Sequence, residues 1–378
     1  MIERWFIHGS LHTGQLRIMM RPNLRQVAPQ HLLPPGSRTR PYRFVHVPKV
    51  FPARHSVFPC RRNYSTAGAS AQSRPMEPAP SQLDFKTHDL GWEKIQAQVE
   101  PYFGEHWNFA SEKEKQAFYD VGFSRAFSCF FPLTLEDRVE ATCRMHYLPL
   151  LIDDQLDNMN LSDMLSYRAR IIQIARRQST PNKSVCVEWM LADTIQLAQS
   201  IDEKLANELV QGFCSLLMAQ TAPERTSVKD LGSYLEHREI DVGRPFYTAL
   251  IRFGANLDIN SGDLKQISAL ESYTFRFLGV LNDIYSWEKE WKAYQARPTD
   301  GSHPFSAIHR SGLSHTACKR LMYSYCRELE ASFKETVETT TRDNGHLLSP
   351  DMERYVKGLE YLMSGFEKWH QWTPRYRS

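Results

Sequence analysis

Apolar residues recur at intervals of three and four along most of the chain after residue 90, the spacing of one buried face of an α-helix. Strong strand signals, internal repeats and glycine-rich phosphate loops are not evident in the sequence. We therefore expect an all-α protein whose helices pack as one barrel-like bundle. The predicted helices span residues 91–103, 111–131, 135–153, 164–177, 184–200, 203–219, 228–253, 264–292, 315–339 and 350–372.

Local signals set some of these helix ends. Ser111 and Glu114 have the spacing of a capping box, and Thr134 with Asp137 has the same pattern at the start of the next helix. Pro149 lies inside that next helix, where it removes one backbone hydrogen bond. We expect a kink or a break there, one turn before an acidic motif.

Charge divides the chain into two unequal parts. The net charge is +3, but residues 1–75 hold eleven Arg and one Lys against the single acid Glu3. The rest of the chain is therefore mildly acidic, which argues against a nucleic-acid-binding body. We expect residues 1–84 to be a basic, Pro- and Arg-rich disordered extension and residues 85–378 to be the folded domain.

The basic extension leaves the location of the protein open. An Arg-rich, acid-poor start is typical of a mitochondrial presequence, but the prolines between residues 28 and 53 would break a targeting helix. A disordered tail, or a wrongly assigned start of the reading frame, explains the same composition. We expect a cytoplasmic protein, with mitochondrial targeting as the alternative. No apolar run is long enough for a transmembrane segment, and the seven scattered cysteines form no CxxC pair.

Three oxygen-bearing side chains share one face of the predicted helix 264–292. Asn282, Ser286 and Glu290 are each four residues apart, and Lys289 lies one position off their line. Amide, hydroxyl and carboxylate oxygens suit Mg²⁺, which also keeps phosphate oxygens in its shell. A solvated polar face on an ordinary helix would have the same spacing, so this motif alone decides little.

A second acidic motif ends the predicted helix 135–153. Asp153 and Asp157 are four residues apart and share a face, and Asp154 is adjacent. Three crowded carboxylates favour a cation among them, although a frayed helix end explains acids equally well. We expect Asp153 and Asp157 to bind metal, and Asp154 to orient Asp153 or to pair with a basic residue. DDxxD followed by NDxxSxxKE is far more specific than either motif alone.

These two motifs, with further matching stretches, resemble the class I terpene cyclases, and among them the fungal sesquiterpene cyclases of the aristolochene synthase type. The resemblance covers roughly residues 91–376. The matching stretches are GFSR at 122–125, LIDD at 151–154, YLEHREIDVG at 234–243, NDIYSWEKE at 282–290 and GLEYLMSG at 358–365.

The resemblance implies a helical bundle around a central apolar cavity and roles for particular residues. It assigns diphosphate binding to Arg238, 44 residues before Asn282, and to the terminal pair Arg375 and Tyr376; Lys289 would reach the same phosphates. Asp241 would orient Arg238, since a buried Arg needs an anion. Trp369 matches a cavity tryptophan whose ring face stabilises a cation. Three Mg²⁺ ions are implied as cofactors.

The predicted cavity departs from that of the resembled enzymes. Phe130 stands where they have a tyrosine, Leu150 where they have a phenylalanine, and Leu216 where they have a third aromatic residue. Phe275 lies on the same helical face as Asn282 and completes the expected lining. Losing a hydroxyl and two rings should change the product more than the ionisation.

We therefore expect a Mg²⁺-dependent sesquiterpene cyclase that ionises farnesyl diphosphate, with a product other than aristolochene. It would act as a monomer or homodimer, without nucleic acid. A trans-prenyltransferase would also use diphosphate and Mg²⁺, but it would normally carry a second aspartate-rich motif and consume isopentenyl diphosphate. A non-catalytic isoprenoid-diphosphate binding protein would bind with metal and show no turnover.

Overall fold

The computed structural model describes residues 79–156, 159–222, 230–296, 306, 308, 314–343 and 348–376. Within these ranges the regular structure is entirely helical, which confirms the predicted all-α class. The helices are α1 (Trp92–His106), α2 (Glu112–Val121), α3 (Phe123–Phe130), α4 (Val139–Leu156), α5 (Leu161–Ala175), α6 (Cys186–Ile201), α7 (Glu203–Gln220), α8 (Leu231–Asp241), α9 (Arg244–Ala255), α10 (Ser261–Gln266), α11 (Ser268–Ala296), α13 (His315–Asp343) and α14 (Pro350–Trp372), with short 3₁₀ turns η1 (Glu136–Arg138) and η3 (Pro374–Tyr376).

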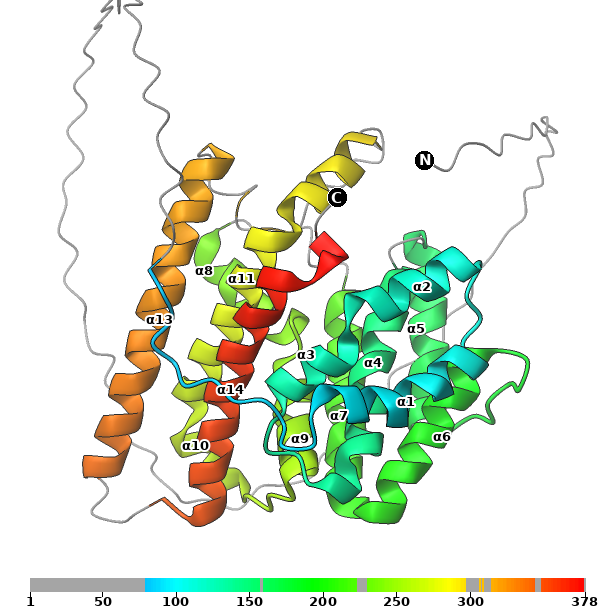
Figure 1. Ribbon diagram of the computed structural model, residues 1–378, viewed down its shortest axis with the longest axis horizontal. Helices are drawn as coiled ribbons and strands as arrows, with labels where there is room; N and C mark the ends of the chain where they lie inside the picture. Colours follow the sequence, from blue (N-terminus) through cyan, green and yellow to red (C-terminus); the bar gives the residue numbers. More distant parts are fainter. Residues whose placement is uncertain are drawn as a thin grey trace, which may run out of the picture. The chain divides into compact units, whose positions relative to one another are not determined.

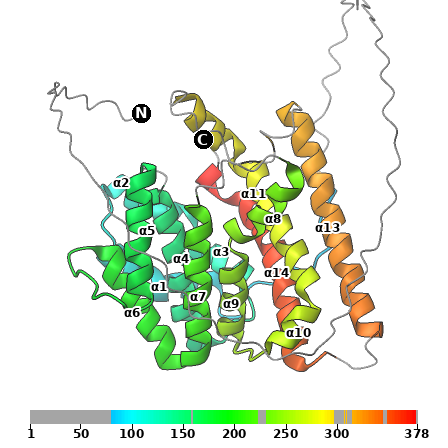
Figure 2. The ribbon, with the colours of Figure 1, turned by 180° about the vertical axis from the view of Figure 1, so that it is seen from behind.

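The long helices run side by side (Figures 1 and 2). Helix α11 packs against α13, α14 and α8, and helix α14 also packs against α3. Helix α7 pairs with α9, and α4 packs against α6. The two helices that carry the acidic motifs, α4 and α11, therefore belong to different parts of the bundle, joined through α9, α14 and α3.

Two predicted helices are each split by a glycine. Residues 111–131 form α2 and α3, separated at Gly122 with φ 69°, and residues 228–253 form α8 and α9, separated at Gly243 with φ 105°. Such positive φ values are open to glycine and costly for other residues. The prediction of single helices was wrong because the hydrophobic period continues through a glycine that the backbone uses as a joint.

Of the two N-terminal caps predicted from the sequence, at Ser111 and Thr134, the structure confirms only the first. The Ser111 Oγ accepts a hydrogen bond from the backbone N–H of Glu114 at 3.2 Å, which confirms that cap. Thr134 does not cap α4, because the 3₁₀ turn η1 lies between them. The N-cap residue of η1 is Leu135, and no side chain caps that turn. Helix α4 is continuous through Pro149, so the predicted break there was wrong. The kink stays a prediction.

The segment before α1 lies along α13 and α14 (Figure 1). The Arg327 Nε donates to the backbone carbonyl of Ala79 at 2.6 Å, and the Ser364 Oγ donates to that of Asp84 at 2.7 Å. Leu83 is buried in the core. Among the described helices, none combines the length and the hydropathy that crossing a membrane would need. The described cysteines are all free thiols.

Candidate active site

Asn282, Ser286 and Glu290 follow one another along α11, as their spacing predicts. Ser286 is 5 % exposed, and its hydroxyl oxygen is buried without a hydrogen-bond partner in the described part of the chain. A buried hydroxyl normally finds a partner, so this oxygen is available to a group that the protein itself does not supply.

Arg238 of α8 is the polar centre of this region. Its Nη2 donates to the Asn282 Oδ1 at 2.7 Å and to the Asp283 Oδ1 at 3.1 Å, and its Nη1 donates to Asp241. Tyr234, one turn earlier on α8, donates its hydroxyl to Asp283. Burial by itself would lower the pKa of Arg238, but the surrounding groups, Asp283 and Asp241 among them, raise it well above its usual value. The guanidinium is therefore permanently charged.

Gly279 makes room for that arginine. It lies on α11 one turn before Asp283, and a Cβ at this position would come within 2.6 Å of the Arg238 Cγ. The Arg238 side chain takes the space that a Cβ would otherwise fill.

The C-terminal turn η3 connects the two acidic motifs. The Arg375 guanidinium donates two bonds to Asp154, at 2.9 and 3.2 Å, and thus reaches the end of α4. The Asn282 amide donates to the Tyr376 hydroxyl at 3.2 Å, which ties the next residue to α11. A pair of terminal residues that could have been a frayed tail therefore spans the gap between α4 and α11.

Charges from both motifs act on this turn. Burial raises the pKa of Tyr376, Arg375 lowers it, and Asp153 and Glu290 raise it further. Asp153 also helps to keep Arg375 charged. Because electrostatic influence falls with distance, Asp153 and Glu290 both lie near the C-terminal turn although they are far apart in sequence. Asp153 in addition accepts a bond from Gln220 at 3.3 Å.

The donor set fits a hard divalent cation. No group of three or more His, Cys, Asp or Glu gathers in a metal-binding arrangement within the described ranges. The candidate set differs from such a group, because Asn282 and Ser286 contribute an amide and a hydroxyl beside Glu290. The unpartnered Ser286 oxygen is the observation that favours a ligand here. Asp157, the second predicted ligand on the α4 side, lies outside the described residues.

The predicted cavity residues are placed unequally. Phe130 and Trp369 meet edge to face with ring centroids 5.8 Å apart, and the Trp369 ring also contacts the Tyr376 ring at 5.9 Å. Leu150 is half-buried on α4. Leu216 is buried beside Gly243, and Phe275 is buried on α11. Among the predicted cavity residues, Trp369 therefore contacts the C-terminal turn, and Phe130 is joined to it through Trp369.

An open pocket of about 400 Å³ lies on the other side of Arg375. Its apolar lining includes Phe109 and Phe118, and its charged lining consists of Glu114, Asp120, Asp154, Lys289 and Arg375. None of the five predicted cavity residues lines it. Lys289, which is exposed, therefore approaches the site from this pocket and not from the aromatic side.

Arg244 does not join the site. Its guanidinium donates to Glu239 at 2.6 Å and to Glu271 at 3.1 and 3.2 Å, so its charge is used between α8, α9 and α11.

Sequence reasoning missed two features of this region. The Tyr234–Asp283 bond joins α8 to α11, and no local spacing relates residues 49 positions apart. His146 lies on α4 four residues before Leu150 and seven before Asp153, a spacing that puts all three on one face of the helix.

The fold and the site define a terpene synthase, and the chain belongs to that family. Residues 145–331 match the family described as terpene synthase family 2, C-terminal metal binding. Aristolochene synthase of Aspergillus terreus is 33% identical over 313 residues, which is 82% of this chain and 97% of the relative. Aristolochene synthase of Penicillium roqueforti is 37% identical over 304 residues, 79% of this chain and 88% of the relative.

The solved structures agree with this assignment. The crystal structure of aristolochene synthase from Penicillium roqueforti matches with a TM-score of 0.69 at 35% identity, over 78% of this chain and 99% of that one. The predicted resemblance to the aristolochene synthase type is confirmed, and the protein is a terpene cyclase. These identities establish the family of this chain, and the product that gives the relatives their name is a property of the relatives.

Proposed function

We propose that the protein is a Mg²⁺-dependent sesquiterpene cyclase that ionises farnesyl diphosphate, cyclises the C15 cation and releases diphosphate. The observation that carries the proposal is the C-terminal turn, where Arg375 contacts the DDxxD motif and Tyr376 contacts the NDxxSxxKE motif. Three groups that bind phosphate well, Arg238, Arg375 and the Tyr376 hydroxyl, thereby converge with the metal-ligand candidates.

The residues act on the leaving group. In the ionisation step the C–O bond breaks, both electrons leave with the diphosphate, and an allylic cation remains. Arg238, Arg375 and Lys289 are the cations that stabilise the negative charge as it develops. When bound by Asp153, Asp157, Asn282, Ser286 and Glu290, three Mg²⁺ ions would supply Lewis-acid stabilisation of the same charge. Trp369 and Phe130 offer ring faces that stabilise a cation without attacking it.

The product is expected to differ from aristolochene. Phe130 lacks the hydroxyl, and Leu150 and Leu216 lack the rings, that the resembled enzymes have at these positions. Such substitutions alter the contour that folds the cation and leave the diphosphate contacts intact. We further propose a cytoplasmic enzyme that acts as a monomer or homodimer.

The test is incubation of the full-length protein with farnesyl diphosphate, with Mg²⁺ or with excess EDTA, followed by gas chromatography with mass detection. We expect Mg²⁺-dependent cyclic C15 products. Geranyl and geranylgeranyl diphosphate test the chain length. Consumption of isopentenyl diphosphate would identify a prenyltransferase instead, and metal-dependent binding without any turnover would identify a binding protein.

The Arg375–Asp154 pair gives a second prediction. Arg375→Gln removes a group that we assign to the diphosphate, whereas Asp154→Asn removes only its carboxylate partner. We expect Arg375→Gln to lower kcat by about 10²-fold or more and Asp154→Asn by clearly less. Steady-state diphosphate release gives kcat for both single variants. The Arg375→Gln/Asp154→Asn double variant completes a double-mutant cycle. Equal losses in all three variants would mean that Arg375 acts only through Asp154.

A further inference from the structure

His146 is a buried polar side chain without an evident structural task. It lies on α4, its exposed fraction is 0%, and neither ring nitrogen has a hydrogen-bond partner in the described part of the chain. Buried polar atoms nearly always have a partner, because leaving one without costs stability. His146 shares the face of α4 that carries Leu150 and Asp153, so a histidine that costs stability there calls for a chemical explanation.

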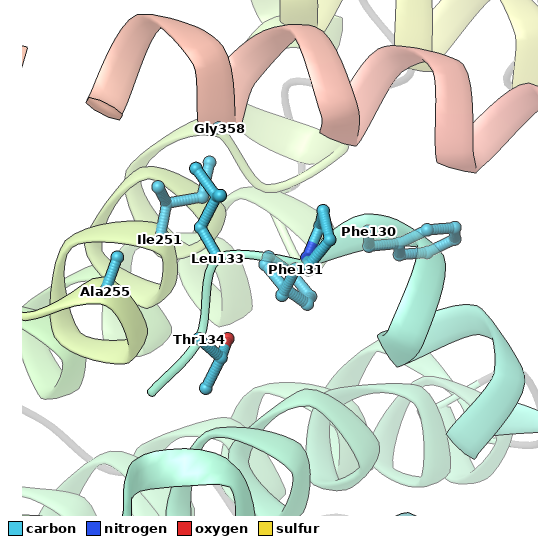
Figure 3. Close-up of a pocket in the computed structure, with 8 residues that line it drawn as sticks. Phe130, Phe131, Leu133, Thr134, Ile251, Ala255 and Gly358 are labelled. Carbon is cyan, nitrogen blue, oxygen red and sulfur yellow. The ribbon is translucent and has the colours of Figure 1, made fainter. Parts of the chain in front are cut away.

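Aromatic rings surround this imidazole. Phe130 and Phe131 meet it edge to face, with centroids 5.6 and 5.5 Å away, and Tyr247 lies 5.9 Å away. Phe127 and Tyr147 complete the aromatic cluster around His146. Phe130 and Phe131 also line a small pocket of about 10 Å³ with Ile251, Ala255 and Gly358 (Figure 3), which is room for at most one water. These two rings therefore contact both this small pocket and the imidazole.

The cluster adjoins the side of the site where the diphosphate would bind. His146 precedes Asp153 by seven residues, about 10 Å along a helix and on the same face. Leu150, between them, is half-buried, so this face of α4 is not sealed. Burial raises the pKa of Tyr247, and Tyr376, Asp153 and Arg375 also act on it, so this cluster member lies within electrostatic reach of the C-terminal turn. Phe130 reaches the same turn through Trp369.

We propose that His146 is the proton acceptor that ends the carbocation cascade in this enzyme. The inference rests on the proposed function, since it requires a substrate whose diphosphate lies at Asp153, Arg375 and Tyr376 and whose hydrocarbon chain reaches the aromatic cluster.

The step needs no other reactant. A C–H bond next to the cationic carbon breaks, and its electron pair becomes the second bond of the new C=C. The proton joins the lone pair of one imidazole nitrogen, and the resulting imidazolium lies among ring faces that favour a cation. The imidazolium returns its proton to water when the product has left.

The protonation state suits this role. Burial lowers the pKa of His146 to about 3, so the imidazole is neutral and carries a free lone pair at neutral pH. A carbocation is a far stronger acid than an imidazolium, so even so weak a base accepts its proton. The same low pKa returns the proton to solvent and restores the base. The Tyr247 phenol, another polar group in the cluster, is a much weaker base.

His146→Phe keeps an aromatic ring and removes both nitrogens, and His146→Leu avoids any excess volume. We expect both variants to release diphosphate from farnesyl diphosphate at a rate close to wild type. The share of the main wild-type alkene should fall by at least about tenfold in favour of other C15 products, because a general base typically contributes more than that. Tm should rise in His146→Leu, since an unpartnered buried polar group is removed.

Tyr247→Phe is the matched comparison, because it removes another polar atom of the cluster and keeps the ring; its share of the main wild-type product should fall by clearly less than in the His146 variants. An unchanged product profile in His146→Phe and His146→Leu would overturn the proposal, as would a wild-type main product that is an alcohol. A change of product in Tyr247→Phe with none in the His146 variants would transfer the role to the tyrosine. Failure of the proposed function can be distinguished from failure of the His146 proposal, because the wild-type protein would then show no turnover of farnesyl diphosphate.

Discussion

Asn282→Ala is expected to reduce diphosphate release from farnesyl diphosphate by about 10³-fold or more, because one side chain serves three partners. Its Oδ1 accepts from Arg238 at 2.7 Å and is a candidate metal ligand, and its Nδ2 donates to the Tyr376 hydroxyl at 3.2 Å. The alanine variant therefore loses a proposed metal ligand, a contact of Arg238, to which we assign the diphosphate, and a hydrogen bond to the C-terminal turn. Steady-state kinetics over a range of Mg²⁺ concentrations measure the loss.

Two variants separate these contributions. Ser286→Ala removes a ligand whose oxygen has no protein partner in the described residues, so Tm should not fall, while the Mg²⁺ concentration for half-maximal activity should rise by about tenfold or more. Asn282→Asp keeps an oxygen ligand and loses the N–H donor to Tyr376, so it should fall between wild type and Asn282→Ala. Normal activity in Ser286→Ala at low Mg²⁺ would disprove the ligand assignment on α11.

Arg238→Ala is expected to give the largest loss of stability, about 3–5 kcal/mol in the free energy of unfolding. The arginine side chain is 9% exposed, and its carboxylate partners Asp283 and Asp241 are 0% and 2% exposed. Removing the guanidinium leaves both carboxylates buried without their cation, which is costlier than never having formed the pair. Turnover should also be lost, because the charge assigned to the diphosphate disappears. Denaturant unfolding and diphosphate release measure the two effects.

A matched arginine and a glycine provide the controls. Arg276 also pairs with an α8 carboxylate, Glu239, but its side chain is 32% exposed and Glu239 keeps Arg244 as a partner. Arg276→Ala should therefore cost only about 1 kcal/mol or less. Gly279→Ala keeps the charge of Arg238 but puts a methyl group 2.6 Å from its Cγ. It should lower turnover more than stability. Equal stability losses in Arg238→Ala and Arg276→Ala would contradict the role of burial.

The sequence predicted the helices best where one hydrophobic face runs without interruption. Residues 203–219 and 350–372 were placed within one residue of α7 and α14, because regular spacing and clear end signals act over a few residues. The prediction of continuous helices failed at Gly122 and Gly243, because the spacing of apolar residues continues across the glycine that separates two helices. The hydrophobic period indicates which face of a helix is buried. It does not indicate that the backbone changes direction at a glycine.

The sequence by itself determined the helical class and the family. It also determined that Asn282, Ser286 and Glu290 share one helical face, because that depends only on spacing within one helix. Only the tertiary structure decided what meets across helices. Arg375 on Asp154, Tyr234 on Asp283 and Gly279 beneath Arg238 join residues far apart in the chain, and each depends on how α4, α8, α11 and η3 pack. The position of His146 was readable from its spacing, but its lack of partners was not. Whether a buried polar atom finds a partner is decided by every neighbouring helix at once.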